Sequence, residues 1–140
     1  MKTFKLKLED THEQIAFALV CAEKEYRICW EINTILQLQL ERVKDHEIKN
    51  KQGEKSQFSL FKYINEDDLL DYFLLRNKTG GNILIPEFKL ADYILIIEGE
   101  IWQVDVDKLK NELLTINSIQ TVLTINSNQL KSKQNLIIDA

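Results

Sequence analysis

The order of apolar and polar residues along the chain predicts a mixed fold of strands and helices. Phe4, Leu6 and Leu8 alternate with lysines, the period-two pattern of a half-buried strand, and predict a short edge strand. The apolar run at residues 15–20 predicts a buried strand because of its length and its Phe and Val content. Residues 11–14 have the spacing of a helix capping box, and if this motif governs, the first third of the chain is mainly helical.

A helix and a second strand are predicted next. Residues 22–37 place polar side chains among apolar ones with roughly helical spacing and contain no helix breaker. Residues 38–43 switch to strict alternation, which predicts a strand. Residues 44–57 are rich in charge and poor in apolar side chains, and they contain Gly53, so we predict an exposed loop.

The middle of the chain predicts a hairpin. Residues 58–64 and 69–76 are rich in aliphatic and aromatic side chains and flank a short acidic turn. The next turn, residues 77–82, contains two adjacent glycines that can adopt the positive φ angles of a tight reversal. Residues 83–85 are expected to return briefly along the sheet before Pro86, which lacks an amide proton, ends the pairing.

The strongest strand signal follows Pro86. Residues 93–97 are apolar at every position, which predicts an interior strand with both faces covered. Asp105 or Asp107 can cap a helix that extends to about Ile116, and residues 119–125 predict a final strand.

Together these elements define an α+β fold in a single domain that spans residues 1–140. Two strand-helix-strand passages, at about 15–43 and 93–125, flank the predicted hairpin. The expected architecture is a largely antiparallel sheet with two helices packed on one face, an elaboration of the ferredoxin-like arrangement. A chain of this length can bury roughly 70% of the surface that it exposes when unfolded, so one core suffices.

Composition and charge narrow the function classes. The 140 residues include 22 acidic and 18 basic side chains, and this net charge of −4 opposes the basic field expected of a nucleic-acid-binding protein. The first residues lack the continuous apolar segment of a signal peptide, and the longest apolar run is too short to span a bilayer. Cys21 and Cys29 form neither a disulfide framework nor a four-ligand metal site. We therefore expect a cytoplasmic protein without membrane contact or cofactor.

One segment resembles a known family signature. Residues 85–93 are similar to the signature of the IPExxxVDY family of small bacterial proteins through Ile85, Pro86, Glu87, Asp92 and Tyr93. Ala91 stands where the signature has valine. Residues 25–33, 58–61 and 130–136 also resemble segments of that family. The resemblance implies a shared fold and a bacterial origin, and it transfers no catalytic residue.

No catalytic or metal-binding motif is present in the sequence. It contains no nucleophile elbow, no phosphate-binding glycine loop and no metal-binding helix motif, so we assign no catalytic residue and no metal ligand. His12 and His46 lie apart in polar contexts and are expected to be ordinary surface histidines. Cys29 is expected to be a small buried side chain, because Arg27 alone is weak support for a reactive thiolate.

Two groups of residues are candidates for a site. The candidates on the predicted first helix are Tyr26, Arg27 and Trp30. The polar members of the signature are Glu87, Asp92 and Tyr93. A buried pair between Arg27 and a signature carboxylate is one way in which the two groups would act together. The alternative is structural, with a carboxylate capping backbone groups after Pro86 and the tyrosine packing in the core.

Three functions follow from these patterns. The first is a non-enzymatic protein-binding or assembly module with a folded protein partner, for which surface aromatic residues would serve as anchors. The second is an RNA-associated accessory protein in which bases stack on sheet aromatics. Those aromatics are Phe58, Phe61, Tyr63, Tyr72 and Phe73. The third is a small-molecule binder or an enzyme of unrecognised type, with a pocket formed by Tyr26, Arg27, Glu87 and Asp92. The sequence does not determine the oligomeric state.

Overall fold

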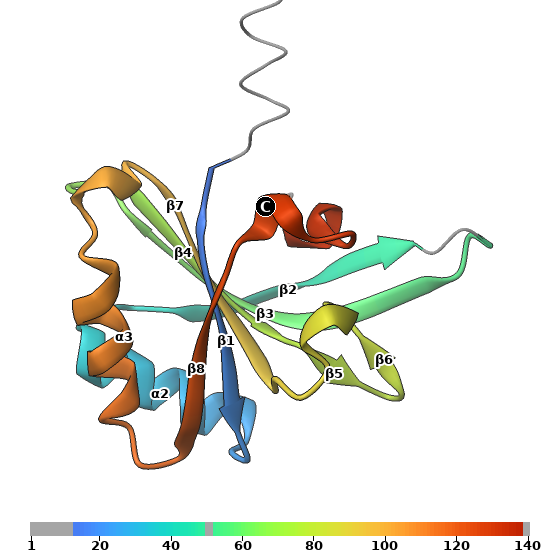
Figure 1. Ribbon diagram of the computed structural model, residues 1–140, viewed down its shortest axis with the longest axis horizontal. Helices are drawn as coiled ribbons and strands as arrows, with labels where there is room; N and C mark the ends of the chain where they lie inside the picture. The colour runs from blue at the N-terminus through green and yellow to red at the C-terminus, as the bar shows by residue number, and fades with distance from the viewer. Residues whose placement is uncertain (1–12, 50–51, 139–140) are drawn as a thin grey trace, which may run out of the picture.

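The computed structural model describes residues 13–49 and 52–138 (Figure 1). The edge strand predicted for residues 4–8 and the start of the capping box lie outside the described residues. In chain order the main elements are β1 (Ile15–Cys21), α2 (Glu25–Leu36), β2 (Glu41–Lys49), β3 (Lys55–Asn65), β4 (Leu70–Arg76), β5 (Lys78–Thr79), β6 (Asn82–Ile83), β7 (Tyr93–Gly99), α3 (Val106–Leu114) and β8 (Ile119–Ile125). Short 3-10 helices are η1 (Pro86–Phe88), η2 (Ile101–Gln103), η3 (Ser127–Gln129) and η4 (Lys133–Leu136).

Six of the strands form one antiparallel sheet in the order β2-β3-β4-β7-β1-β8. Strands β1, β4, β7 and β8, with α2 after β1 and α3 after β7, follow the β-α-β-β-α-β path of the ferredoxin-like arrangement. Strands β2 and β3 are an insertion between α2 and β4 that extends the sheet at one edge. The predicted α+β class, with two helices on a largely antiparallel sheet, is therefore confirmed.

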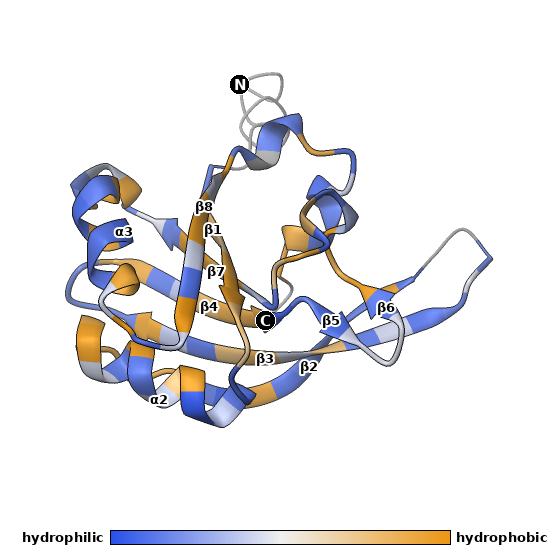
Figure 2. Ribbon diagram, turned by 60° about the horizontal axis from the view of Figure 1, so that its bottom comes forward, coloured by the Kyte–Doolittle hydropathy of each residue, from blue (hydrophilic) through white to orange (hydrophobic). Residues whose placement is uncertain are grey.

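Both helices cover the same face of the sheet. Ile28 and Ile32 of α2 and Leu113 of α3 are fully buried in one cluster with strand residues such as Phe17 and Leu95. In Figure 2 the helices carry both hydrophobic and hydrophilic residues, whereas β1 and β7 are hydrophobic over most of their length. The helices therefore contribute only one stripe each to the core, while the central strands contribute both faces.

The opposite face is covered by irregular segments. We call residues 126–138 the C-terminal segment, and Figure 1 shows it lying across this side of the sheet. Leu84 and Ile85, just before η1, and Leu136, in the C-terminal segment, are fully buried in a second cluster with Ile94 and Ile96. Since β7 lies between β4 and β1 and is covered on both faces, the prediction of an interior strand after Pro86 is confirmed.

The exposed loop predicted for residues 44–57 is wrong. Most of these residues belong to β2 and β3, which pair as a hairpin that projects beyond the rest of the sheet in Figure 1. The pairing shifts register between Val43 and His46, so the inward positions Val43, His46 and Ile48 are not spaced by two throughout. This irregularity hides the strand pattern, and the high charge is typical of a strand at the edge of a sheet.

The first third of the chain is not helical throughout. Ile15–Cys21 form β1 between β7 and β8, so the strand prediction is confirmed and the capping-box alternative is wrong. Helix α2 begins at Glu25, three residues later than predicted, and ends at Leu36, before Gln37, whose φ of 55° is left-handed. The strand predicted at residues 38–43 begins only at Glu41.

Residues after the double-glycine turn do not rejoin the main sheet as predicted. Asn82 and Ile83 pair instead with Lys78 and Thr79 in a separate two-stranded hairpin. The chain then turns inward, because the next two residues are core residues, and Pro86 starts η1 at the position where a missing amide proton costs least. The later predictions are confirmed: Asp105 caps α3 by accepting a hydrogen bond from the Lys108 N–H, and β8 spans the predicted residues.

We expect the substitution Ile96→Asp to destabilise the protein strongly. Ile96 is fully buried on β7, opposite Phe73 on one side and Ala16 on the other, so an aspartate there would be a buried charge without a partner. The expected loss is roughly 3–5 kcal/mol of unfolding free energy, measured by urea denaturation, together with little soluble protein. The control is Leu90→Asp at an exposed leucine, and an Ile96→Asp variant that unfolds like the parent would contradict this placement of β7.

Candidate functional site

A single buried asparagine organises the loop that carries the signature. Asn77, directly after β4, is fully buried, and its side-chain Nδ2 donates to the carbonyl oxygens of Phe88 (3.0 Å) and Ala91 (2.9 Å). Its Oδ1 accepts from the Ile85 N–H at 2.9 Å. Its main-chain N–H donates to Asp92 O (2.9 Å), and its carbonyl accepts from the Leu84 N–H (2.7 Å). The loop backbone between Leu84 and Asp92 is thus satisfied largely by one residue.

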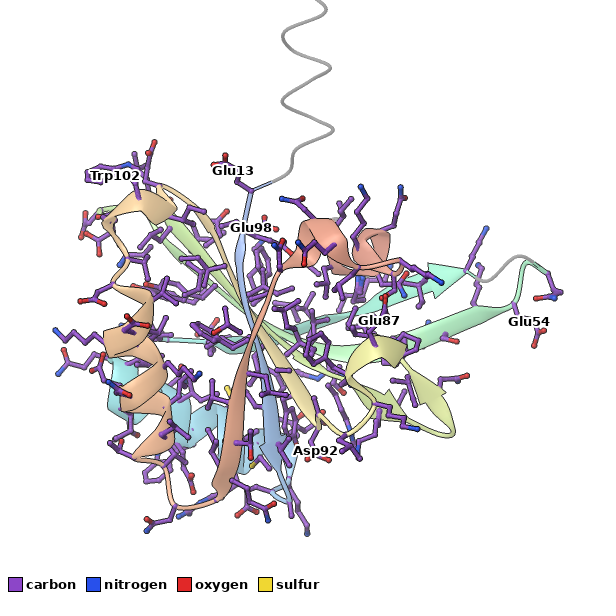
Figure 3. The ribbon with its side chains drawn as sticks, viewed as in Figure 1. Glu13, Glu54, Glu87, Asp92, Glu98 and Trp102 are labelled. Atoms are coloured by element: carbon purple, nitrogen blue, oxygen red, sulfur yellow. The ribbon has the colours of Figure 1, made fainter. Side chains whose placement is uncertain are left out.

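Glu87 joins the signature to the C-terminal segment. Its carboxylate accepts from the Ser132 Oγ–H at 2.6 Å and from the Ser132 N–H at 3.1 Å. Figure 3 shows Glu87 pointing from η1 toward the C-terminal segment. Burial alone would raise the pKa of Glu87, but the hydrogen bonds from Ser132 outweigh it and lower the pKa below its ordinary value. The carboxylate is therefore the form that holds the two segments together.

Asp92 and Tyr93 join the signature to the end of β1. The Cys21 N–H donates to Asp92 Oδ2 at 2.7 Å, and Lys78 Nζ lies 3.3 Å from Asp92 Oδ1. The buried Tyr93 donates its hydroxyl proton to the carbonyl oxygen of Glu23, in the turn before α2. Burial is the largest cause that raises the pKa of Tyr93 to about 12, so the phenol stays protonated and can donate this bond.

The five signature residues thus occupy a junction between elements. Ile85 is core, Pro86 starts η1, and the three polar members bond to backbone or side-chain groups of other segments. Figure 3 places Glu87 and Asp92 at different heights along the sheet, each directed toward a different neighbour. Asn77 was missed by the sequence analysis because an asparagine before glycines is also the ordinary composition of a turn.

A shallow hollow of about 590 Å³ lies beside Asp92, at the start of α2. Its lining includes the candidates Tyr26, Asp92 and Tyr93, whereas Glu87 and Arg27 lie elsewhere. The charged groups that line it are Glu23, Lys24, Glu25, Arg76, Lys78 and Asp92. Acidic and basic groups are equal in number, so the hollow favours neither anions nor cations. The four residues predicted to form a small-molecule pocket do not converge.

The candidates on α2 form an exposed surface. Trp30 is 57% exposed, and the Arg27 guanidinium carbon lies 4.9 Å from the centre of its indole ring. Arg27 Nε also donates to Glu31 Oε1 at 2.8 Å, one helical turn further along. Tyr26, also exposed, meets the edge of Phe61 on β3 with ring centres 5.7 Å apart. We call Tyr26, Arg27 and Trp30 the α2 surface, and Arg27 pairs within this helix and not with a signature carboxylate.

The other sequence candidates are structural. His46 is buried and its Nε2 lies 2.8 Å from the carbonyl oxygen of Asn135, so Nε2–H donates there and the predicted surface histidine is wrong. Cys29 is buried as predicted, and burial raises the pKa of its thiol to about 11. Burial also raises the pKa of Cys21. Within residues 13–49 and 52–138, no group of three His, Cys, Asp or Glu side chains could hold a metal ion.

Comparisons with known proteins identified no relative of this chain. No family model, no curated protein and no solved structure matches the chain. In the part of the chain that the structure describes, no helix is both long and apolar enough to cross a membrane. The class defined by fold and site is an α+β protein with a hydrogen-bonded junction at the signature and an aromatic surface on α2.

The junction predicts that Asn77→Ala will be strongly destabilising. The substitution leaves the carbonyl oxygens of Phe88 and Ala91 and the N–H of Ile85 without their partner. We expect a loss of about 2–4 kcal/mol of unfolding free energy, since each orphaned buried group costs about 1–3 kcal/mol before relaxation. The matched control is Asn82→Ala, at an exposed position of β6, which should unfold like the parent in the same denaturation experiment. Equal stabilities of the two variants would contradict the role of Asn77.

The lowered pKa of Glu87 predicts an acid-sensitive attachment of the C-terminal segment. Because the pKa is depressed in the folded protein, the stabilisation is present above the ordinary glutamate value of 4.5 and is lost as the pH falls through the lower, folded value. The protection of the amides of residues 130–138 against hydrogen exchange, after correction for the intrinsic pH dependence of the exchange rate, should therefore fall on acidification in the parent.

The control is Glu87→Gln, which removes the titrating group and should show low protection of the same amides, with little dependence of that protection on pH in the same range. If this variant instead keeps the parent's melting temperature and exchange while losing a bound partner, Glu87 is a recognition residue and not a structural tie.

Proposed function

We propose that this protein is a non-enzymatic protein-binding or assembly module of the bacterial cytoplasm and a member of the IPExxxVDY family that it resembles. The observation that carries the binding proposal is Trp30, a large aromatic side chain exposed on α2 and stacked with Arg27. Trp, Tyr and Arg are the residues most enriched among the hot spots of protein interfaces, and the α2 surface contains one of each.

The arrangement of the α2 surface favours recognition because part of it is ordered before any partner binds. Arg27 is held on one side by Glu31 and lies over the indole of Trp30. Fixing long side chains on binding costs about 0.5–1.5 kcal/mol each, so contacts made in advance reduce that cost. Since Glu31 already neutralises Arg27, the expected partner is a folded protein with an apolar pocket for the indole, and not an acidic ligand.

The family proposal is supported by contacts among the segments that resemble it. Tyr26, in the segment 25–33, meets Phe61, in the segment 58–61. Glu87, in the signature, bonds to Ser132, in the segment 130–136. Residues that resemble one family are thus neighbours in space, as expected of a set that defines one fold.

The aromatic residues that suggested RNA binding are not exposed for stacking on bases. Phe58, Phe61 and Phe73 are buried, and Tyr63 and Tyr72 are half-buried and stacked on each other with ring centres 6.0 Å apart. These aromatics provide no open stacking surface for bases. The net charge of −4 also disfavours binding to the phosphate backbone of RNA.

The proposal is tested by comparing the two tryptophans of the chain as capture variants. Trp30→Ala removes the stacked indole on α2, whereas Trp102→Ala removes an indole that is 80% exposed on η2 and bonded to Glu100. We expect a partner captured from a lysate of the source cells, detected by mass spectrometry, to be retained by the parent and by Trp102→Ala. In Trp30→Ala the affinity for this partner should fall at least tenfold, equivalent to a loss of about 1.4 kcal/mol of binding free energy.

Both variants change exposed side chains, so circular dichroism and melting temperature should match those of the parent. A parent that captures no specific macromolecule at gentle salt, or equal capture by the two variants, would refute the proposed role of the α2 surface.

A further inference from the structure

The two edges of the main sheet differ sharply in charge. At one edge, β2 carries the charged residues Glu41, Arg42, Lys44, Asp45, Glu47 and Lys49 and contains a register shift. At the other edge, β8 has the sequence Ile-Gln-Thr-Val-Leu-Thr-Ile and no charge at all. Charged side chains and bulges are the usual means by which proteins prevent edge strands from pairing with other chains. The β2 edge has both. The pairing of β8 with β1 also shifts register, between Val20 and Cys21, so the absence of charged side chains is what distinguishes the β8 edge.

Strand β8 is available for pairing along its outer side. It pairs with β1 on its inner side, and no other strand within residues 13–49 and 52–138 lies along its outer side. Figure 1 shows β8 at the front of the molecule, with α3 beside it over only part of its length. Leu123, opposite Ala18 of β1, is 42% exposed. Among the described residues, β8 thus has backbone groups on its outer side that pair with no other strand, and it has an exposed apolar side chain.

We propose that β8 pairs antiparallel with β8 of a second copy of this chain, with the two-fold axis at Leu123. The result is one continuous sheet across both copies. Antiparallel pairing of two identical strands about such an axis places Leu123 opposite its own copy. Thr121 then lies opposite Ile125, and Val122 opposite Thr124.

The charge pattern favours a second copy as the occupant. In a symmetric pair, any charge near the axis faces the same charge, and like charges directly opposite each other are destabilising. Residues 113–130 contain no Asp, Glu, Lys, Arg or His, although 29% of the chain is charged. The neutral stretch extends beyond β8 at both ends, so two copies with a net charge of −4 each can approach here without local repulsion. The pairs Thr-Ile, Val-Thr and Leu-Leu have high β-propensity and are mutually compatible.

This inference does not depend on the proposed function. The α2 surface and β8 are different elements, and the hollow beside Asp92 is lined by neither Leu123 nor its neighbours on β8. Loss of partner capture in Trp30→Ala and loss of self-association in a β8 variant are separate outcomes, each measured without the other.

The test is the mass of the full chain in solution, with Leu123→Lys as the disrupting variant. Light scattering over roughly 1 to roughly 300 μM, which brackets micromolar dissociation constants, should give twice the 16.4 kDa of one chain for the parent. Leu123→Lys puts two positive charges at the axis and should give the single-chain mass, while its circular dichroism spectrum matches that of the parent and shows that the chain is still folded. Leu90→Lys adds the same charge at a leucine that is 73% exposed outside the sheet, and it should keep the doubled mass.

A pair of cysteine variants tests the register. Opposed residues in an antiparallel pair have Cα atoms about 4.5–5.5 Å apart, within reach of a disulfide. Mild oxidation of Leu123→Cys should therefore give a covalent dimer on a non-reducing gel. In Thr121→Cys the two thiols are about 14 Å apart along the strands, at about 3.4 Å per residue, and should not link. A parent that remains a single chain throughout, a doubled mass in Leu123→Lys, or equal crosslinking of the two cysteine variants would overturn the proposal.

Discussion

The carboxamide of Asn77 lies beneath a loop whose regular secondary structure is a single turn of 3-10 helix, η1, which pairs only part of the loop backbone. Between Leu84 and Asp92 the chain enters the core, makes one turn of η1 and then enters β7. Each buried amide and carbonyl on this path needs a partner, because leaving one unpaired costs as much as a sizeable fraction of a protein's net stability. A residue with two donors and an acceptor on its side chain, in addition to its main-chain pair, is suited to that task.

The signature residues depend on this constraint. With the loop fixed by Asn77, Glu87 reaches the C-terminal segment, while Asp92 and Tyr93 reach the end of β1 and the turn before α2. The polar atoms of the signature thus connect parts of the chain that are far apart in sequence. This accounts for a run of conspicuous polar residues without assigning them chemistry on a substrate. The α2 surface, in contrast, has its polar contacts within one helix and leaves the indole of Trp30 open.

Elements with a regular pattern of apolar residues could be predicted from the sequence, whereas elements in which that pattern is interrupted could not. The apolar run of β7 and the caps of α3 define their elements locally, since burial on both faces and a capping carboxylate leave direct marks in sequence. The register shift in β2 interrupts the alternation of apolar and polar residues, so the sequence does not show the strand. His46 was predicted wrongly because its burial depends on a contact with the distant Asn135. Asn77 shows the same limit for the site. Its partners are set by the tertiary path of the loop, which no local pattern encodes.

The position of β1 inside the sheet, between β7 and the edge strand β8, has a consequence for how the chain is made. Ile15 of β1 lies opposite Ile97 of β7, and Ala16 lies opposite Ile125 of β8, so both neighbours of the first strand are translated long after it. During synthesis, the consecutive strands β2, β3, β4 and β7 can pair with one another as they emerge, since each lies beside the next. Strand β1 cannot pair until β7 has been made, and its second partner, β8, is translated later still. Pairings of such long sequence separation close slowly, and the most apolar strand of the chain is therefore exposed longest in the nascent protein.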